Sequence, residues 1–219
     1  MRFVVALVLV GCGTDHHGVA ADAAVDAPDY APDASCRAQS FDYQGVFEDV
    51  ATGTVSRGAM LVVRGDPTRH TMTTSTGSFV LCAPSAAPFV VDVDAPDDQL
   101  DGRIVVQEYD GESNSDFVPF TPAGLAAVLS GLGQTYDPST GIVIAEQLTD
   151  SGDMSLSGSH GAALTNDVGW MTSARGRTVM FPNVPPGTPM LSRFADGFQV
   201  ATEVFAGQIT WVAVPIVQI

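Results

Sequence analysis

The stretch RTVMFPNVPPGTPMLSRF, residues 177–194, carries the pattern that decides the fold. An apolar run leads into a proline-rich segment with one glycine, and a second run with alternating character follows it. Proline has no backbone N–H to donate within a sheet, whereas glycine and asparagine tolerate the backbone angles of tight turns. The stretch therefore predicts two short β-strands joined by a tight turn.

The same order of features occurs earlier in the chain, in TGSFVLCAPSAAPFVVDV, residues 76–93. Residues 45–47 (GVF) likewise match residues 141–143 (GIV), and the GA step at 58–59 matches the one at 161–162. The offset between matching positions stays between 96 and 103 residues. A nearly constant offset indicates a degenerate internal duplication.

Further short runs of apolar or alternating residues are punctuated by Gly, Pro, Asp and Ser, at the spacing typical of β-sandwiches. The predicted strands are 43–50, 58–65, 69–75, 78–83, 88–95 and 103–109 in the first half, and 141–148, 160–166, 177–183, 188–195, 198–206 and 209–217 in the second. The chain is therefore predicted to be mainly β, with two small antiparallel sandwiches.

One helix is predicted between the two series, in TPAGLAAVLSGLG, residues 121–133. Thr121 is the expected N-cap, Pro122 the first helical residue and Gly133 the stop. The apolar residues of this segment recur at helical spacing and form one stripe, so the helix should pack against a sheet or fill the seam between the halves. They are Leu125, Val128, Leu129 and Leu132.

The second half, residues 141–219, resembles the carboxypeptidase-regulatory-like family of transthyretin-like sandwiches, on FPNVPPGT and the closing GQITWVAVPI. The first half resembles it loosely, since its turn CAPSAAP lacks the glycine. The resemblance implies two transthyretin-like or Ig-like sandwiches, at 36–107 and 141–219, joined by an acidic loop and helical linker at 108–140. It implies little about activity, because such modules serve as spacers, adhesion units and binding domains.

The amino-terminal segment resembles a lipoprotein signal. Its apolar run, residues 3–10, is shorter than a membrane-spanning helix requires and suits a secretory signal. Leu9, Val10, Gly11 and Cys12 resemble a bacterial lipobox, which implies removal of residues 1–11 and acylation of Cys12, by palmitate among other chains. The resemblance favours an outer-membrane address. The alternative is that the segment is a buried strand and Cys12 a core thiol.

Residues 12–35 are expected to hold the lipid anchor and a disordered tether, because 18–35 consists almost entirely of Ala, Asp and Pro. If Cys12 is acylated, Cys36 and Cys82 are the remaining cysteines, and an exported compartment favours a disulfide between them. The alternative is a pair of buried free thiols.

The charge balance excludes several functions. The chain has 25 acidic residues and nine basic ones, all of them arginine, with a formal net charge of −16. Such a chain repels phosphate backbones, so no nucleic-acid partner is expected. The absence of lysine also excludes a Walker A loop and Schiff-base catalysis.

Catalytic and metal motifs are nearly absent. SGSHG, residues 157–161, has the wrong spacing for a nucleophile elbow, and His70 and His160 are expected to lie at the surface. DGESNSD, residues 110–116, has oxygen-bearing side chains at alternate positions, which makes them calcium candidates, although the EF-hand pattern is not met. These are Asp110, Glu112, Asn114 and Asp116. The alternative is a solvated acidic loop.

The expected function is that of a membrane-anchored envelope lipoprotein that binds a protein or glycan without catalysis. Trp170 follows the turn NDVG and is the candidate for a ligand-stacking residue, whereas Trp211 lies in an apolar strand and should be core. No metal or cofactor is expected, with calcium as the exception. The alternatives are an envelope hydrolase with a dispersed or calcium-dependent site, and a structural spacer.

Overall fold

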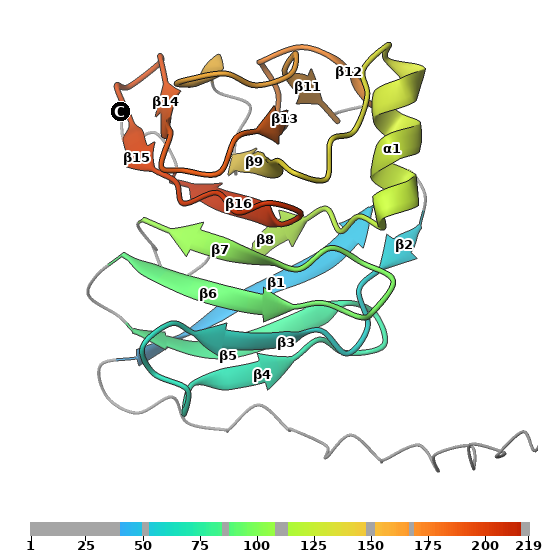
Figure 1. Ribbon diagram of the computed structural model, residues 1–219. Coiled ribbons are helices and arrows are strands. Elements are labelled where there is room, and N and C mark those ends of the chain that lie inside the picture. Colours follow the sequence, from blue (N-terminus) through green and yellow to red (C-terminus); the bar gives the residue numbers. More distant parts are fainter. Residues whose placement is uncertain are drawn as a thin grey trace, which may run out of the picture. The chain divides into compact units, whose positions relative to one another are not determined.

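The strands form layered sheets with one helix at their side in the computed structural model, which describes residues 40–49, 53–84, 88–107, 114–147, 152–166 and 169–215 (Figure 1). The predictions on the lipobox, the tether, Cys36, Asp110 and Glu112 lie outside these residues. The described chain is mainly β, as predicted. No helix among the described residues is long and apolar enough to span a membrane.

The first half forms a sandwich of two sheets. Its strands are β1 (Ser40–Asp49), β2 (Thr54–Val55), β3 (Met60–Val63), β4 (His70–Met72), β5 (Ser78–Pro84), β6 (Phe89–Asp94), β7 (Gly102–Val106) and β8 (Asn114–Phe117). β1 pairs antiparallel with β2 and β5 and parallel with β8, while β4, β3, β6 and β7 follow one another in the facing sheet. Figure 1 shows β1 and β5 behind β3, β6 and β7. Aromatic side chains such as Tyr43, Phe47, Phe79 and Phe117 fill the space between the sheets.

The second half repeats this plan. Its strands are β9 (Gly141–Gln147), β10 (Met154–Leu156), β11 (Leu164–Thr165), β12 (Met171–Thr172), β13 (Thr178–Val184), β14 (Met190–Arg193), β15 (Gln199–Ala201) and β16 (Ile209–Val214). β9 pairs antiparallel with β13 as β1 does with β5, and β16 runs parallel to β9 as β8 does to β1. The sheet of β10, β14 and β15 packs on the large sheet through a separate apolar cluster. The repeated pairing agrees with the predicted duplication, and the prediction of two sandwiches is confirmed.

The two sandwiches are joined edge to edge. β7 pairs parallel with β16, from Gly102 opposite Ile209 to Val106 opposite Ala213, so that one nine-stranded sheet crosses from the first half to the second. A Cβ on Gly102 would overlap the Ile209 carbonyl oxygen and would lie 2.5 Å from Trp211 Cζ3. Only glycine therefore permits this close approach.

The predicted linker contains a strand as well as the helix. β8 pairs with β1 and belongs to the first sandwich, although it lies beyond residue 107. Its sequence, NSDF, has a single apolar residue and no strand periodicity, so the pattern did not reveal it.

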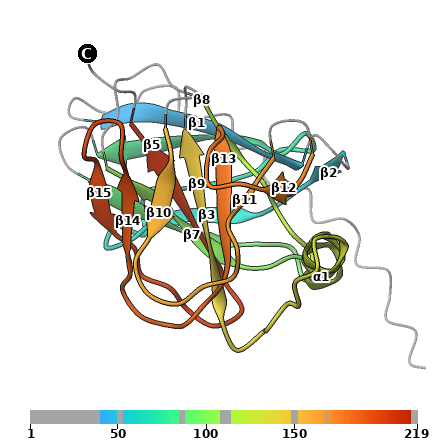
Figure 2. The same cartoon turned by 90° about the horizontal axis from the view of Figure 1, so that it is seen from above.

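The helix α1 (Pro122–Gly131) confirms the predicted segment. The Thr121 hydroxyl accepts a hydrogen bond from the Gly124 N–H at 2.9 Å, which caps its first turn. Leu125 and Leu129 are fully buried in the core of the first sandwich, which also includes residues of β9, β11 and β13. Figure 2 shows α1 at the side of the fold away from β14 and β15.

β13 contains a special backbone position near its end, just before the segment with Pro185 and Pro186. Asn183 has a φ of 55°, at a point where the pairing of β13 with β9 shifts register. Its side-chain amide donates to the Thr135 carbonyl at 2.8 Å and accepts from the Asp137 N–H at 3.0 Å. Asparagine is thus suited both to the left-handed backbone and to holding the loop that follows α1.

Candidate functional site

An open cavity lies over β3, β6 and β7, on the side of the sheet that faces away from the first core. In these strands Leu61, Val91 and Ile104 point into the core, and their neighbours point to the opposite face. Strand register then places Val62 opposite Asp92, and Asp92 opposite Arg103. The cavity has a volume of 330 Å³, and its lining includes Met60, Val62, Asp92, Asp94, Asp101 and Arg103.

Four charged side chains form a continuous chain beside the cavity. Arg64 donates to both carboxylate oxygens of Asp92, at 3.1 and 2.5 Å, and to Glu203 Oε2 at 2.8 Å. Arg103 donates to the same Glu203 oxygen at 3.0 Å. Glu203 comes from the segment between β15 and β16, so both sandwiches contribute to one arrangement. Charged hydrogen bonds of this forked kind fix geometry as well as contributing energy.

Arg103 lies at the base of this arrangement, with 7% of its surface exposed. It donates to Gln208 Oε1 at 3.1 Å, and its guanidinium carbon lies 3.9 Å from the centroid of the Phe205 ring. Its Nε is buried without an acceptor in the described structure. Burial, followed by the nearby Arg64, lowers the pKa of Arg103, but a guanidinium remains charged at neutral pH. The hydrogen bond to Asp92 is the main influence that raises the pKa of Arg64.

Two further carboxylates line the cavity outside this chain of charges. Asp101 accepts a hydrogen bond from the Ala95 N–H at 2.9 Å, and Asp94 is exposed at the end of β6. Neither takes part in an ion pair among the described residues. The two arginines balance Asp92 and Glu203, so the cavity carries a net negative charge.

The predicted stacking residue is less available than expected. Trp170 is half-buried, and its ring packs at 5.6 Å from that of Phe120. The indole N–H is buried without an acceptor in the described structure. Only part of the ring surface is therefore open for stacking on a ligand.

The calcium candidates are only partly described. Asp116 is exposed on β8 and Asn114 begins that strand, whereas Asp110 and Glu112 lie outside the described residues. The described residues contain no group of three or more potential metal-binding side chains. Calcium binding stays a prediction.

The two histidines of the folded part come from different segments, His70 from the start of β4 and His160 from the connection between β10 and β11. His70 is exposed, with Nδ1 3.1 Å from the Pro67 carbonyl oxygen. His160 Nδ1 lies 2.6 Å from the Gly161 carbonyl oxygen, and the ring packs edge-on against Phe181. A neighbouring backbone carbonyl therefore orients each ring, and packing on Phe181 also holds the ring of His160.

Cys82 is half-buried on β5. Neither of the other cysteines lies in the described residues, so the pairing with Cys36 stays a prediction.

Sequence reasoning missed Arg64, Arg103 and Glu203 as site residues. A signal was present for their partner Asp92. In VVDVD, residues 90–94, Asp92 and Asp94 alternate with apolar residues and so mark a strand face outside the core. Glu203 had no such signal, since it meets Arg64 across 139 residues of chain.

Comparisons with known proteins provide little further information. No protein-family model matches the chain, and no curated protein matches it. Among solved structures, the Bacillus anthracis TIE protein is similar with a TM-score of 0.30 and 10% identity, over 80% of this chain and 34% of that chain. This chain thus spans about a third of the length of that structure, and a similarity this low carries no argument about fold or function.

Proposed function

We propose that this chain is an envelope lipoprotein whose two sandwiches act together as a non-catalytic binding module. The observation that carries the proposal is the open cavity over β3, β6 and β7, beside which charged side chains of both sandwiches meet. An arrangement of this kind holds charged groups in place before a partner arrives, which lowers the ordering cost of binding.

The chemistry of the cavity favours binding over catalysis. Its lining, within the described chain, combines aspartate, arginine and glutamine with apolar residues and contains no histidine, serine or cysteine. Arg64 and Arg103 are already engaged by carboxylates, and such fixed charges recognise a partner rather than exchange protons.

The anchoring part of the proposal rests on the amino-terminal sequence. Leu9-Val10-Gly11-Cys12 would direct cleavage before Cys12 and its acylation, and residues 13–35 would tether the module to the outer membrane. A disulfide between Cys36 and Cys82, which is part of the proposal, would fit an oxidising compartment.

An intact-mass measurement without reducing agent, on protein made in a two-membrane bacterium, tests the anchor. We expect a chain that starts at Cys12, heavier by its acyl groups and lighter by the two hydrogens of one disulfide. A chain that retains residues 1–11 without acylation contradicts the lipoprotein assignment.

Capture of envelope components on the detergent-solubilised full chain tests the binding role. We expect a protein or glycan partner to be retained by the wild type and lost with Glu203→Gln, which weakens the link between Arg64 and Arg103. Asp97→Asn changes an exposed carboxylate outside the cavity and serves as the control. No retained partner with any of the three proteins favours the alternative of a structural spacer.

A further inference from the structure

We infer that the cavity takes the basic side chain, lysine or arginine, of a protein partner, an inference that rests on the proposed binding function. The first reason is the charge that remains after internal pairing. Asp92 and Glu203 are balanced by Arg64 and Arg103, and the carboxylates of Asp94 and Asp101 are left facing the same cavity. A cation that enters would meet two carboxylates without a cationic partner in the described structure.

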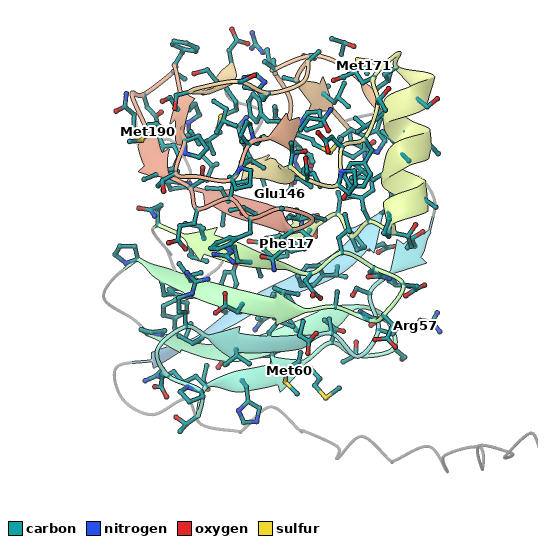
Figure 3. The ribbon with its side chains drawn as sticks, in the orientation of Figure 1. Arg57, Met60, Phe117, Glu146, Met171 and Met190 are labelled. Atoms are coloured by element: carbon teal, nitrogen blue, oxygen red, sulfur yellow. The ribbon has the colours of Figure 1, made fainter. Side chains whose placement is uncertain are left out.

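The shape of the wall suits a long basic side chain. Met60 and Val62 line the cavity beside the carboxylates, and Met60, which is labelled in Figure 3, lies opposite Asp94 in the strand register. Lysine and arginine have an apolar stem and a charged tip, so the methylenes can pack on these residues while the tip reaches a carboxylate.

Arg103 supplies an independent observation. Its side chain is more than nine-tenths buried, it lines the cavity, and its Nε has no acceptor in the described structure. A donor withheld from water in this way favours a ligand that carries an acceptor. A peptide segment provides a backbone carbonyl next to its basic side chain, whereas a free polyamine has cations and no acceptor.

The charge of the whole chain supports the same class of partner. With a net charge of −16 and no lysine, the protein attracts basic partners over distance and offers little competition from its own amines. Attraction by net charge does not require a binding site. The experiment must therefore distinguish binding in the cavity from attraction by the charge of the whole protein.

The probe is an acetylated, amidated peptide of four alternating lysine and serine pairs, added to the detergent-solubilised full chain at about 150 mM salt, where longer-range attraction is screened. A carbodiimide then joins each lysine amine to a carboxylate in contact with it, forming an amide with loss of the activated oxygen as a urea. Because the chain contains no lysine, amines of the probe dominate the reaction. We expect peptide mapping to place the cross-links at Asp94 and Asp101.

A pair of matched double variants provides the quantitative test. Asp94→Asn with Asp101→Asn should weaken peptide binding about tenfold or more. The amide oxygen that Asp101→Asn introduces can still accept from the Ala95 N–H, and a thermal melt confirms folding. Asp97→Asn with Asp98→Asn removes the same charge from exposed residues outside the cavity lining and should change binding less than about twofold.

Three results would overturn the inference. Cross-links spread over many carboxylates, with equal loss in both double variants, would show attraction by net charge alone. Spermine, at equal charge, displacing the peptide and cross-linking at Asp94 and Asp101 would make a small polyamine the occupant. An envelope partner that binds the Asp94→Asn, Asp101→Asn variant as well as the wild type would leave the proposed function standing and remove this cavity as its basic-residue site.

Discussion

At the scale of single residues, Glu146 is a carboxyl group that the fold keeps from water. It lies on β9, where the Thr178 hydroxyl donates to its Oε2 at 2.7 Å while Oε1 has no partner in the described structure (Figure 3). Burial is the main influence that raises its pKa well above the ordinary value; the Asp116 carboxylate adds to this shift and Arg177 opposes it. The folded protein therefore favours the neutral carboxyl group.

This raised pKa predicts a pH-dependent stability. A folded-state pKa above the unfolded value gives a stabilisation that is complete below the unfolded pKa, near 4.5, and is lost as pH rises through the folded pKa. Glu146→Gln keeps a neutral side chain, so urea unfolding from pH 4 to 9 should show the variant gaining stability relative to the wild type as pH rises. Parallel curves for the two proteins would contradict the prediction.

Arg193 is a buried charge that secures the start of the β14–β15 turn. Its exposed fraction is 1%, it donates to both carboxylate oxygens of Asp196, at 3.0 and 2.5 Å, and it reaches Gln147 Oε1 at 3.4 Å. Removing one partner of a buried pair costs about 3–5 kcal/mol, and the partial exposure of Asp196 places the effect near the lower end.

We therefore expect Arg193→Ala to lower the free energy of unfolding by about 3 kcal/mol in urea titrations. Arg69→Ala breaks a similarly spaced but more exposed pair with Asp66 and should cost less than about 1 kcal/mol. Equal losses in the two variants would argue against a special role for burial at Arg193.

At the scale of elements, the contact of β7 with β16 depends on the absence of a side chain at Gly102. Gly102→Ala places a methyl group against the Ile209 carbonyl and the Trp211 ring, and overpacking of this kind costs about 1–3 kcal/mol. Gly131→Ala is the matched control, because its new methyl group meets nothing within 4 Å at the end of α1. Thermal unfolding should show destabilisation by the first change and a gain of up to about 1 kcal/mol from the second.

The elements also show which strands could be predicted from the sequence pattern and which could not. Strands such as β5, β9 and β13 are seven residues long, and the predicted runs include most or all of each. β2 and β12 have two residues each, too few for an alternation to be recognised, and they form because neighbouring strands offer them partners. The capping residues of α1 were predictable because Thr121 and Pro122 act within one turn of the chain.

At the scale of the whole molecule, the sandwiches should unfold together. β16 pairs with β9 of its own half and with β7 of the other, and Glu203 binds Arg64 and Arg103 of the first half. Trp211 lies on β16 of the second half, but its ring packs on Phe47 and Phe117 of the first half, so its fluorescence reports the contact between the two sandwiches, whereas far-ultraviolet circular dichroism reports strands of both. We expect the two signals to give coincident urea transitions. Transitions that do not coincide would show that the two sandwiches unfold separately.

The sequence by itself determined the mainly β class, the duplicated order of strands, the position of the helix and the excess of negative charge, because each depends on spacing or composition within short segments. Only the tertiary structure decided that the two sandwiches share one sheet and that Arg64, Asp92, Arg103 and Glu203 meet beside one cavity. The reason is physical: strand pairing and ion pairing between distant residues depend on which sheet edges and faces come together, and no local pattern of residues specifies that choice.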